Sequence, residues 1–282
     1  MVQKVLITGA NGQLGKELVQ YFSDKNGFEV YGFGRDDLDI TNQEQVDEQF
    51  FKIQPNLVIH SAAYTQVDLA ESDVDKAYLV NGIGTRNISV AAENINAKLV
   101  YISTDYVFNG TGVKPYDEFM QTSPIGVYGK TKLAGEQFVR DFHNKFFIVR
   151  TSWVYGKHGN NFVKTMLKLG SEKDKLSVVN DQLGAPTYTL DLAACIFELI
   201  RTSKYGIYHV SNSGSCSWYE FAKTIFEEAS IKVELNPCTT DEFPRPAPRP
   251  KYSVFDHMAL RLNNFSPMRH WKEALKEYIN NQ

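Results

Sequence analysis

The chain has 282 residues, of which 43% are hydrophobic and 22% charged, as in an ordinary globular protein of one large domain or one domain with a small appendage. Its formal net charge of −3 and the lack of long runs of like charge argue against nucleic acid or a membrane surface as a general partner. No apolar run approaches the roughly 20 residues that cross a bilayer, and the apolar stretch after Met1 is too short for a signal peptide.

The cysteine pattern indicates a reducing compartment. Cys195, Cys216 and Cys238 are widely spaced, odd in number and outside any CxxC motif, which argues against a disulfide framework or a zinc site. The histidines are equally scattered. We therefore expect free thiols, no bound metal and a cytoplasmic location.

Short apolar runs alternate with amphipathic segments over the first two-thirds of the chain. Strands that are apolar throughout and alternate with helices indicate a parallel sheet covered by helices on both faces, an α/β Rossmann-type doubly wound fold. The elements predicted in chain order are strand Val2–Thr8, helix Gln13–Phe22, strand Phe28–Phe33, helix Asn42–Ile53 with Thr41 or Asn42 as its cap, strand Asn56–His60, helix Val80–Ile95, strand Lys98–Ser103, helix Lys130–His143 and strand Phe146–Arg150.

After Arg150 this alternation loosens, and the run FPRPAPRP at Phe243–Pro250 carries four prolines that exclude a regular helix or a central strand. We expect a small C-terminal lid that binds substrate over the strand ends. The predicted division assigns 1–152 to an NAD(P)-binding domain, with 188–204 returning to it, and 153–187 and 205–282 to the lid.

A glycine-rich run, TGANGQLG, follows the first predicted strand directly. Its GxxGxxG spacing, between a strand and a helix at the start of an alternating chain, indicates a dinucleotide-binding turn, although a tight turn without a ligand is the alternative. Gly9 would permit the turn, Gly12 the approach of a pyrophosphate to the backbone, and Gly15 the packing of helix on strand. The cofactor-binding residues expected in this turn are Gly9, Asn11, Gly12, Gln13, Leu14 and Gly15.

The run GRDDLDI follows the second predicted strand, where the two nicotinamide cofactors are distinguished. An acidic side chain there holds the ribose 2′-hydroxyl of NADH, whereas an arginine accepts the 2′-phosphate of NADPH. Arg35 comes first and favours NADPH, while Asp36 and Asp37 leave NADH possible or form a solvated turn. We expect Ile40 to pack on the adenine and Asp39 to accept from its amino group.

Tyr128 and Lys132 are four residues apart after Ser123-Pro124, a pair that suits the first turn of a helix. Residues with this spacing share one helix face, so both side chains are expected to point into one site. The Lys132 ammonium is expected to lower the pKa of Tyr128 from about 10. Such a phenol exchanges a proton with a carbonyl or hydroxyl oxygen, although an amphipathic helix with a partly buried tyrosine has the same spacing.

Ser103 and Thr104 stand at the end of the fourth predicted strand, where side chains of this fold face the ligand crevice. Adjacent residues of an extended strand point to opposite faces, so only one hydroxyl can meet the reacting oxygen. We expect it to be Thr104, which would stabilise charge developing on that oxygen.

Taken together, these motifs resemble the extended type of short-chain dehydrogenase/reductase. The runs TGANGQLG, LDI, STDYVF at Ser103–Phe108, YGKTKLAGE at Tyr128–Glu136 and GAPTY at Gly184–Tyr188 are similar to those of dTDP-4-dehydrorhamnose reductases. The resemblance spans nearly the whole chain, from Lys4 to Trp271. It implies the reduction, with NADPH or NADH, of the 4-keto group of dTDP-4-dehydro-L-rhamnose to dTDP-L-rhamnose, a precursor of cell-surface polysaccharide.

The same resemblance implies roles for individual residues. Tyr128 would be the proton donor, Lys132 would support it and hold the nicotinamide ribose, and Thr104 would tune the tyrosine. The sugar contacts implied are Thr104, Asp105, Tyr106 and Trp153, and the cofactor contacts implied after the third strand are Ala62, Ala63, Tyr64 and Thr65.

Two features depart from the family pattern. Asn109 stands where an aspartate is usual after Val-Phe, in a loop that should not touch the chemistry. Acidic residues that bind magnesium at a dimer interface in some members cannot be placed, so the oligomeric state remains open between monomer and homodimer.

Two other functions use the same fold. A nucleotide-sugar 4-epimerase needs the same Tyr-Lys pair, and a non-catalytic regulatory subunit would keep only the fold. The related 4,6-dehydratases place Asp-Glu after the catalytic threonine, whereas this chain has Asp105-Tyr106. Without the glutamate, dehydration lacks its base, which favours simple reduction of a carbonyl.

Overall fold

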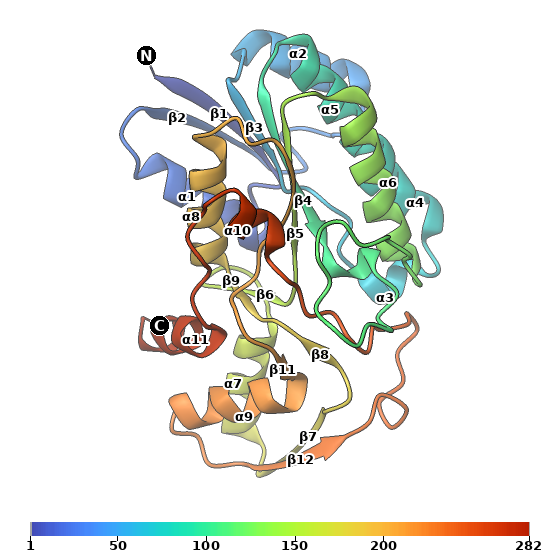
Figure 1. The fold of residues 1–282 in the computed structure, drawn as a ribbon, viewed down its shortest axis with the longest axis vertical. Coiled ribbons are helices and arrows are strands. Elements are labelled where there is room, and N and C mark those ends of the chain that lie inside the picture. Colours follow the sequence, from blue (N-terminus) through green and yellow to red (C-terminus); the bar gives the residue numbers. More distant parts are fainter. Residues whose placement is uncertain (1, 282) are drawn as a thin grey trace.

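The computed structural model describes residues 2–281, which form a large lobe on a six-stranded sheet and a small lobe beyond the strand ends (Figure 1). All six strands are parallel, in the order β10-β5-β4-β3-β1-β2. Their bounds are β1 (Gln3–Thr8), β2 (Phe28–Phe33), β3 (Leu57–His60), β4 (Lys98–Thr104), β5 (Phe146–Thr151) and β10 (Gly206–His209). Every residue of β3 is buried, as expected for a strand covered on both faces. The predicted Rossmann-type doubly wound fold is confirmed.

Helices cover the two faces of the sheet and give each its own core (Figure 1). On one face lie α1 (Gln13–Ser23), α8 (Thr189–Ile200) and α10 (Met258–Leu262). On the other lie α2 (Gln43–Ile53), α5 (Thr85–Asn94) and α6 (Val127–Phe142), with the short helices α3 (Val67–Ala70) and α4 (Val74–Tyr78) beside α6. Of the two caps expected for α2, Thr41 and Asn42, the structure shows Asn42, whose side chain accepts from the Gln45 backbone N–H. No helix within residues 2–281 is long and apolar enough to cross a membrane.

The helix predicted at Val80–Ile95 is divided. Residues Leu79–Gly84 form a wider π-helical turn, η1, and only Thr85–Asn94 is α-helical. Gly84 lets this turn pack closely on Ile40, because a Cβ there would lie 2.7 Å from Ile40 Cδ1. Such bulges often occur at functional sites, and this one turns Asn81 inward, where it is fully buried.

The expectation that Ser123-Pro124 begins the Tyr128 helix is wrong. Ser123 donates its backbone N–H to Val107 O at 2.9 Å, which holds this segment outside the helix. The helix α6 begins at Val127, after an extended Gly126. Glu71 supplies the missing cap, because its Oε1 accepts from the Val127 N–H at 2.8 Å, and a carboxylate is favourable at a helix N-terminus.

The small lobe has a separate core, which includes Phe221 and Trp271. Its elements are β6 (Val154–Tyr155), α7 (Phe162–Glu172), β7 (Lys175–Val179), β8 (Leu183–Gly184), β9 (Thr187–Tyr188), β11 (Cys216–Ser217), α9 (Trp218–Glu228), β12 (Glu234–Cys238) and α11 (Trp271–Asn280). The expected range 205–282 differs from the structure in two parts. The strand β10 pairs with β5 in the main sheet, and α10 packs in the core of the large lobe, so both belong to that lobe.

Candidate active site

A crevice opens where the chain changes direction across the sheet. The strands β1 and β3 are neighbours, but β1 leads to β2 on one side and β3 leads to β4 on the other. Loops diverge at such a switch point and leave a ligand site at the carboxyl ends of the strands. A cavity of about 1130 Å³ lies here. The predicted cofactor residues that border it are Gly9, Asn11, Gly12, Gln13, Leu14, Gly15, Arg35, Asp39, Ile40, Ala62, Ala63, Tyr64, Thr65, Tyr128 and Lys132.

The glycine loop packs too closely for larger residues. Gly9 has a φ of +70°, and a Cβ on it would lie 2.6 Å from Ala62 N. A Cβ on Gly15 would lie 2.0 Å from Gly9 O, so α1 begins directly against the turn. The start of α1 has no side-chain cap, which leaves backbone N–H groups available for an anion. The residues present therefore fit a pyrophosphate.

The loop after β3 is held against the cavity by buried Asn81. Its Oδ1 accepts from Tyr64 N at 2.7 Å, and its Nδ2 donates to Tyr64 O at 3.1 Å. The same Nδ2 donates to Thr131 Oγ1 on α6 at 2.9 Å. One amide thus connects the cofactor loop to the Tyr128 helix. Asn81 cannot be identified from the sequence, because a lone asparagine in a predicted helix carries no signal.

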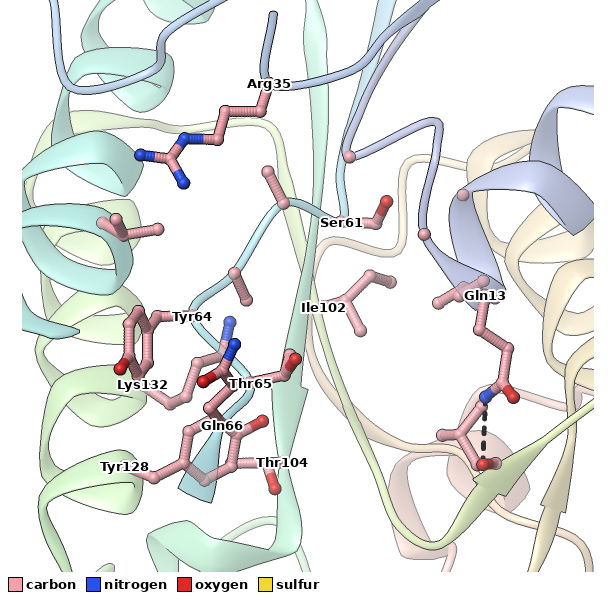
Figure 2. Close-up of a pocket in the computed structure, with 18 of the residues that line it drawn as sticks. Gln13, Arg35, Ser61, Tyr64, Thr65, Gln66, Ile102, Thr104, Tyr128 and Lys132 are labelled. Atoms are coloured by element: carbon pink, nitrogen blue, oxygen red, sulfur yellow. Dashed lines mark hydrogen bonds between the residues drawn. The ribbon is translucent and has the colours of Figure 1, made fainter. Parts of the chain in front are cut away.

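Two of the acidic residues after β2, Asp37 and Asp39, have local partners. Asp37 accepts from Gly34 N at 2.8 Å, and Asp39 accepts from the N–H and hydroxyl of Thr41 at 2.9 and 2.7 Å. Their hydrogen-bonding capacity is therefore partly used within the loop. Arg35 borders the cavity, and Figure 2 shows its guanidinium extending past the loop that carries Tyr64.

Thr104, Tyr128 and Lys132 meet at one end of the cavity. Tyr128 and Lys132 project from adjacent turns of α6 toward the end of β4, where Thr104 stands (Figure 2). Thr104 Oγ1 accepts from Tyr106 N at 3.2 Å and lies 3.0 Å from Asp105 Oδ1. The neighbouring Ser103 hydroxyl instead donates to Glu136 at 2.5 Å. The structure thus places Thr104, rather than Ser103, beside the tyrosine.

The expected effect of Lys132 on Tyr128 is not found in this structure. Burial raises the pKa of Tyr128 well above its ordinary value, the Asp105 charge adds to the rise, and the nearby Thr104 hydroxyl partly offsets it. Burial also lowers the pKa of Lys132 to about 7, against an opposing contribution from Glu136. Both groups are desolvated, so both charged forms are disfavoured. Burial, and not the charge of Lys132, therefore determines the direction of the Tyr128 pKa shift.

Lys132 has an aromatic neighbour that sequence analysis missed. Its Nζ lies 4.2 Å from the centroid of the Tyr101 ring, and the Tyr101 hydroxyl donates to Lys132 O at 3.2 Å. An ammonium over a tyrosine face is stabilised by the ring quadrupole. One turn further along α6, Glu136 forms a buried ion pair with Arg150 at 2.7 Å. In the sequence, the one sign of this ion pair is the four-residue spacing from Lys132 to Glu136, which places both side chains on one face of the helix.

The residues expected at the sugar separate into two environments. Thr104, Tyr106 and Trp153 border the cavity, whereas Asp105 does not. Asp105 is buried, and burial raises its pKa to about 6 against the opposing effect of hydrogen bonds from Ser253 and Thr104. Trp153 is half-buried and stacks on Trp218 with ring centroids 3.5 Å apart. One residue can therefore serve both as a wall of the cavity and as part of the small-lobe core.

Comparison with known proteins identifies the family. The family model described as RmlD substrate binding domain matches residues 3–282. The chain is 48% identical over 276 residues to the spore coat polysaccharide biosynthesis protein SpsK of Bacillus subtilis (strain 168), covering 98% of this chain and 96% of that protein. It is 40% identical over 285 residues to a dTDP-4-dehydrorhamnose reductase of Aggregatibacter actinomycetemcomitans, covering 97% of each.

A solved structure agrees over the whole chain. The dTDP-4-dehydrorhamnose reductase of Bacillus anthracis str. Ames, crystallised in complex with NADP, superposes with a TM-score of 0.97 at 55% identity, covering 100% of both chains. The full-length family match, the sequence relatives and this structure agree with the motifs around Thr104, Tyr128 and Lys132. This chain belongs to the dTDP-4-dehydrorhamnose reductase family.

Proposed function

We propose that this protein uses NADPH to reduce the 4-keto group of dTDP-4-dehydro-L-rhamnose, giving dTDP-L-rhamnose. The observation that carries the proposal is the convergence of Thr104, Tyr128 and Lys132 at one end of the cavity. Related proteins carry the name of this reductase at about 40% identity, and the Bacillus anthracis protein was crystallised with NADP.

The cofactor site follows from the glycine loop and the loops beside it. The N-terminus of α1 and the turn at Gly9 would hold the pyrophosphate, because backbone N–H groups and the helix dipole favour an anion there. Arg35 would pair with the 2′-phosphate of NADPH, and NADH remains a possible cofactor. Ile40, which borders the cavity, would pack on the adenine, and Lys132 would hold the nicotinamide ribose.

The reaction needs a proton at the carbonyl oxygen, and Tyr128 would supply it. The bound dihydronicotinamide supplies the hydride to C4. Because burial raises the pKa of Tyr128, its phenol is protonated at neutral pH and carries the proton that the reaction needs. The Thr104 hydroxyl, beside the same oxygen, would stabilise the phenolate that remains. A proton from solvent then restores the phenol.

The sugar would lie between Tyr106 and Trp153, which border the cavity at its Tyr128 end. We assign Asp105 no direct sugar contact, since it does not border the cavity, and place it behind Thr104 instead. Three free cysteines fit the expected cytoplasmic location, and a monomer and a homodimer are both compatible with this site.

The test is incubation of the purified protein with dTDP-4-dehydro-L-rhamnose and NADPH or NADH, followed at the nicotinamide absorbance with product identified by mass spectrometry. One cofactor consumed per dTDP-L-rhamnose formed is expected. An epimerase would interconvert dTDP-sugars with no net oxidation of NADPH. A regulatory subunit would bind the cofactor but would neither reduce nor epimerise the dTDP-sugar.

A further inference from the structure

The proline-rich segment 243–250 reaches the large lobe beside the active site. After β12 the chain returns from the small lobe toward α3, as Figure 1 shows in orange-red. The Ala247 N–H lies 3.3 Å from Asp68 Oδ1 on α3. Pro248 lies close to Gly126, the residue before α6, because a Cβ added to Gly126 would lie 3.5 Å from the proline ring. The segment therefore packs beside the helix that carries Tyr128.

Arg249 makes the polar contacts of this segment. Its Nη2 pairs with Asp68 Oδ1 at 2.8 Å, and its Nη1 donates to the Tyr106 hydroxyl at 3.2 Å. The guanidinium carbon lies 5.9 Å from the centroid of the Tyr106 ring. The Arg249 side chain is only 18% exposed and that of Asp68 33%, so this is not an open surface pair. A planar guanidinium can hold both partners at once.

Tyr106 in turn contacts the proposed proton donor. The rings of Tyr106 and Tyr128 meet edge to face, with centroids 5.5 Å apart at 78°. Their backbones are also close, since a Cβ on Gly129 would lie 2.1 Å from Tyr106 O. Among the hydrogen bonds of residues 2–281, the Tyr106 hydroxyl has Arg249 as its recorded partner. The guanidinium therefore fixes the outer end of a ring whose edge touches Tyr128.

We propose that Arg249 is a positioning residue for the reaction: anchored by Asp68, it holds the Tyr106 ring against Tyr128 and so completes the substrate side of the site. This inference rests on the proposed reductase function for its kinetic consequence. Arg249 does not border the cavity, so it acts through Tyr106 and not on the substrate. The proline segment thereby acquires a role, because its fixed backbone delivers Arg249 to this place.

The kinetic test compares Arg249→Gln, Asp68→Asn, Tyr106→Phe and the double variant Arg249→Gln/Tyr106→Phe. Misplacing a reacting group by about 1 Å can cost 10²-fold, so we expect Arg249→Gln to lower kcat roughly 10-fold or more while the Kd for NADPH stays within about 2-fold. Asp68→Asn should act in the same direction with a smaller effect. The double variant should be no slower than the slower single variant, because both changes remove the same contact, the one between Arg249 and the Tyr106 hydroxyl.

Arg269→Gln provides a matched control. Arg269 also belongs to a partly exposed ion-pair group, with Asp191 and Glu277, and lies away from the cavity. Its replacement should lower the melting temperature without changing kcat or KM. Arg249→Lys should recover part of the lost kcat, because a lysine can pair with Asp68 but cannot also reach Tyr106 with a planar fork.

A crystal structure of Arg249→Gln with NADP⁺ gives a readout that does not depend on turnover. We expect the Tyr106 ring to leave its edge-to-face contact with Tyr128, and to keep that contact in Arg269→Gln. An unmoved Tyr106 ring, or single-variant effects that multiply in the double variant, would overturn the proposal. Failure of the parent protein to reduce the dTDP-sugar would instead count against the reductase function, and the position of the ring would still decide the role of Arg249.

Discussion

Gln13 of the glycine loop donates from Nε2 to the Val154 carbonyl at 3.0 Å, which joins the cofactor loop to the first strand of the small lobe (Figure 2). Its Oε1 accepts from Asn161 Nδ2 at 2.9 Å, and Asn161 also caps α7. Both ends of this side chain therefore contact the small lobe. Gln13 was expected to contact the cofactor. In addition, its side chain connects the cofactor loop to the small lobe.

Gln13→Ala should therefore weaken the binding of the dTDP-sugar more than the binding of the cofactor. Two lost hydrogen bonds of about 0.5–1.5 kcal/mol each would raise the KM for the sugar nucleotide on the order of 10-fold. The Kd for NADPH, measured by fluorescence titration, should change less than about 3-fold. Gln20→Ala on the same helix is the control, since the Gln20 side chain donates to exposed Asp24 and makes no other hydrogen bond within residues 2–281. A larger change in NADPH affinity than in KM would make Gln13 chiefly a cofactor ligand.

Tyr128→Phe should retain NADPH binding and lose most turnover, because it removes the proton that the reaction needs. General acid catalysis contributes about 10²–10⁴-fold, and kcat should fall by that order. Tyr78→Phe, on α4 and outside the cavity lining, should keep the parent rate. Stopped-flow measurement of a single turnover separates this step from product release. A rate within about 3-fold of the parent would rule out Tyr128 as the proton donor.

Arg35→Ala should weaken the binding of NADPH and leave the affinity for NADH almost unchanged, because only NADPH carries the 2′-phosphate. A hydrogen bond to a charged group is worth about 1.5–3 kcal/mol, which corresponds to roughly 10- to 100-fold in Kd. Arg35→Lys keeps the charge without the planar fork and should give an intermediate Kd. Calorimetric titration with both cofactors measures the ratio, and equal losses for NADPH and NADH would place Arg35 in solvent.

Trp153→Ala should raise the KM for the dTDP-sugar and cost moderate stability. The lost stack on Trp218 accounts for about 0.5–1.5 kcal/mol. Trp218→Ala loses the same stack but does not border the cavity, so it should lower the melting temperature similarly and raise KM less. Saturating dTDP-sugar should quench the fluorescence of the parent more than that of Trp153→Ala. Equal quenching in both proteins would make Trp153 purely structural.

Lys132→Met should be more stable than the parent protein at neutral pH, though inactive. The folded-state pKa of Lys132 is lowered to about 7 from its ordinary 10.5, so between these values the unfolded chain binds more protons. The penalty from Lys132 is complete below pH 7 and decreases by about 1.4 kcal/mol per pH unit up to 10.5. Urea unfolding at pH 7 and pH 9.5 should show the stability gap narrowing as pH rises. A constant gap would mean that Lys132 is fully charged in the folded protein.

Local patterns in the sequence predicted five of the six strands of the main sheet and most of the helices, together with the glycine loop and Thr104, Tyr128 and Lys132, which border the cavity. Strand and helix periodicity can be detected within a few residues, and the glycine spacing indicates where a turn must pack closely. Asn109, a departure from the family pattern, accepts hydrogen bonds from Thr111 and Tyr116 in its own loop and does not border the cavity. The position of β10 was missed, because a four-residue strand has a weak pattern and its place depends on pairing with β5.

The tertiary structure alone decided the electrostatics and the long-range contacts of the site. The Tyr-Lys spacing predicts that both side chains share a face, but the pKa of each depends on burial by segments far along the chain. Arg249 and Tyr106 are separated by 143 positions, and Gln13 and Val154 by 141, so no local pattern connects them. Sequence determines such pairs only through the complete fold, because desolvation and hydrogen-bond geometry exist only once distant elements have packed together.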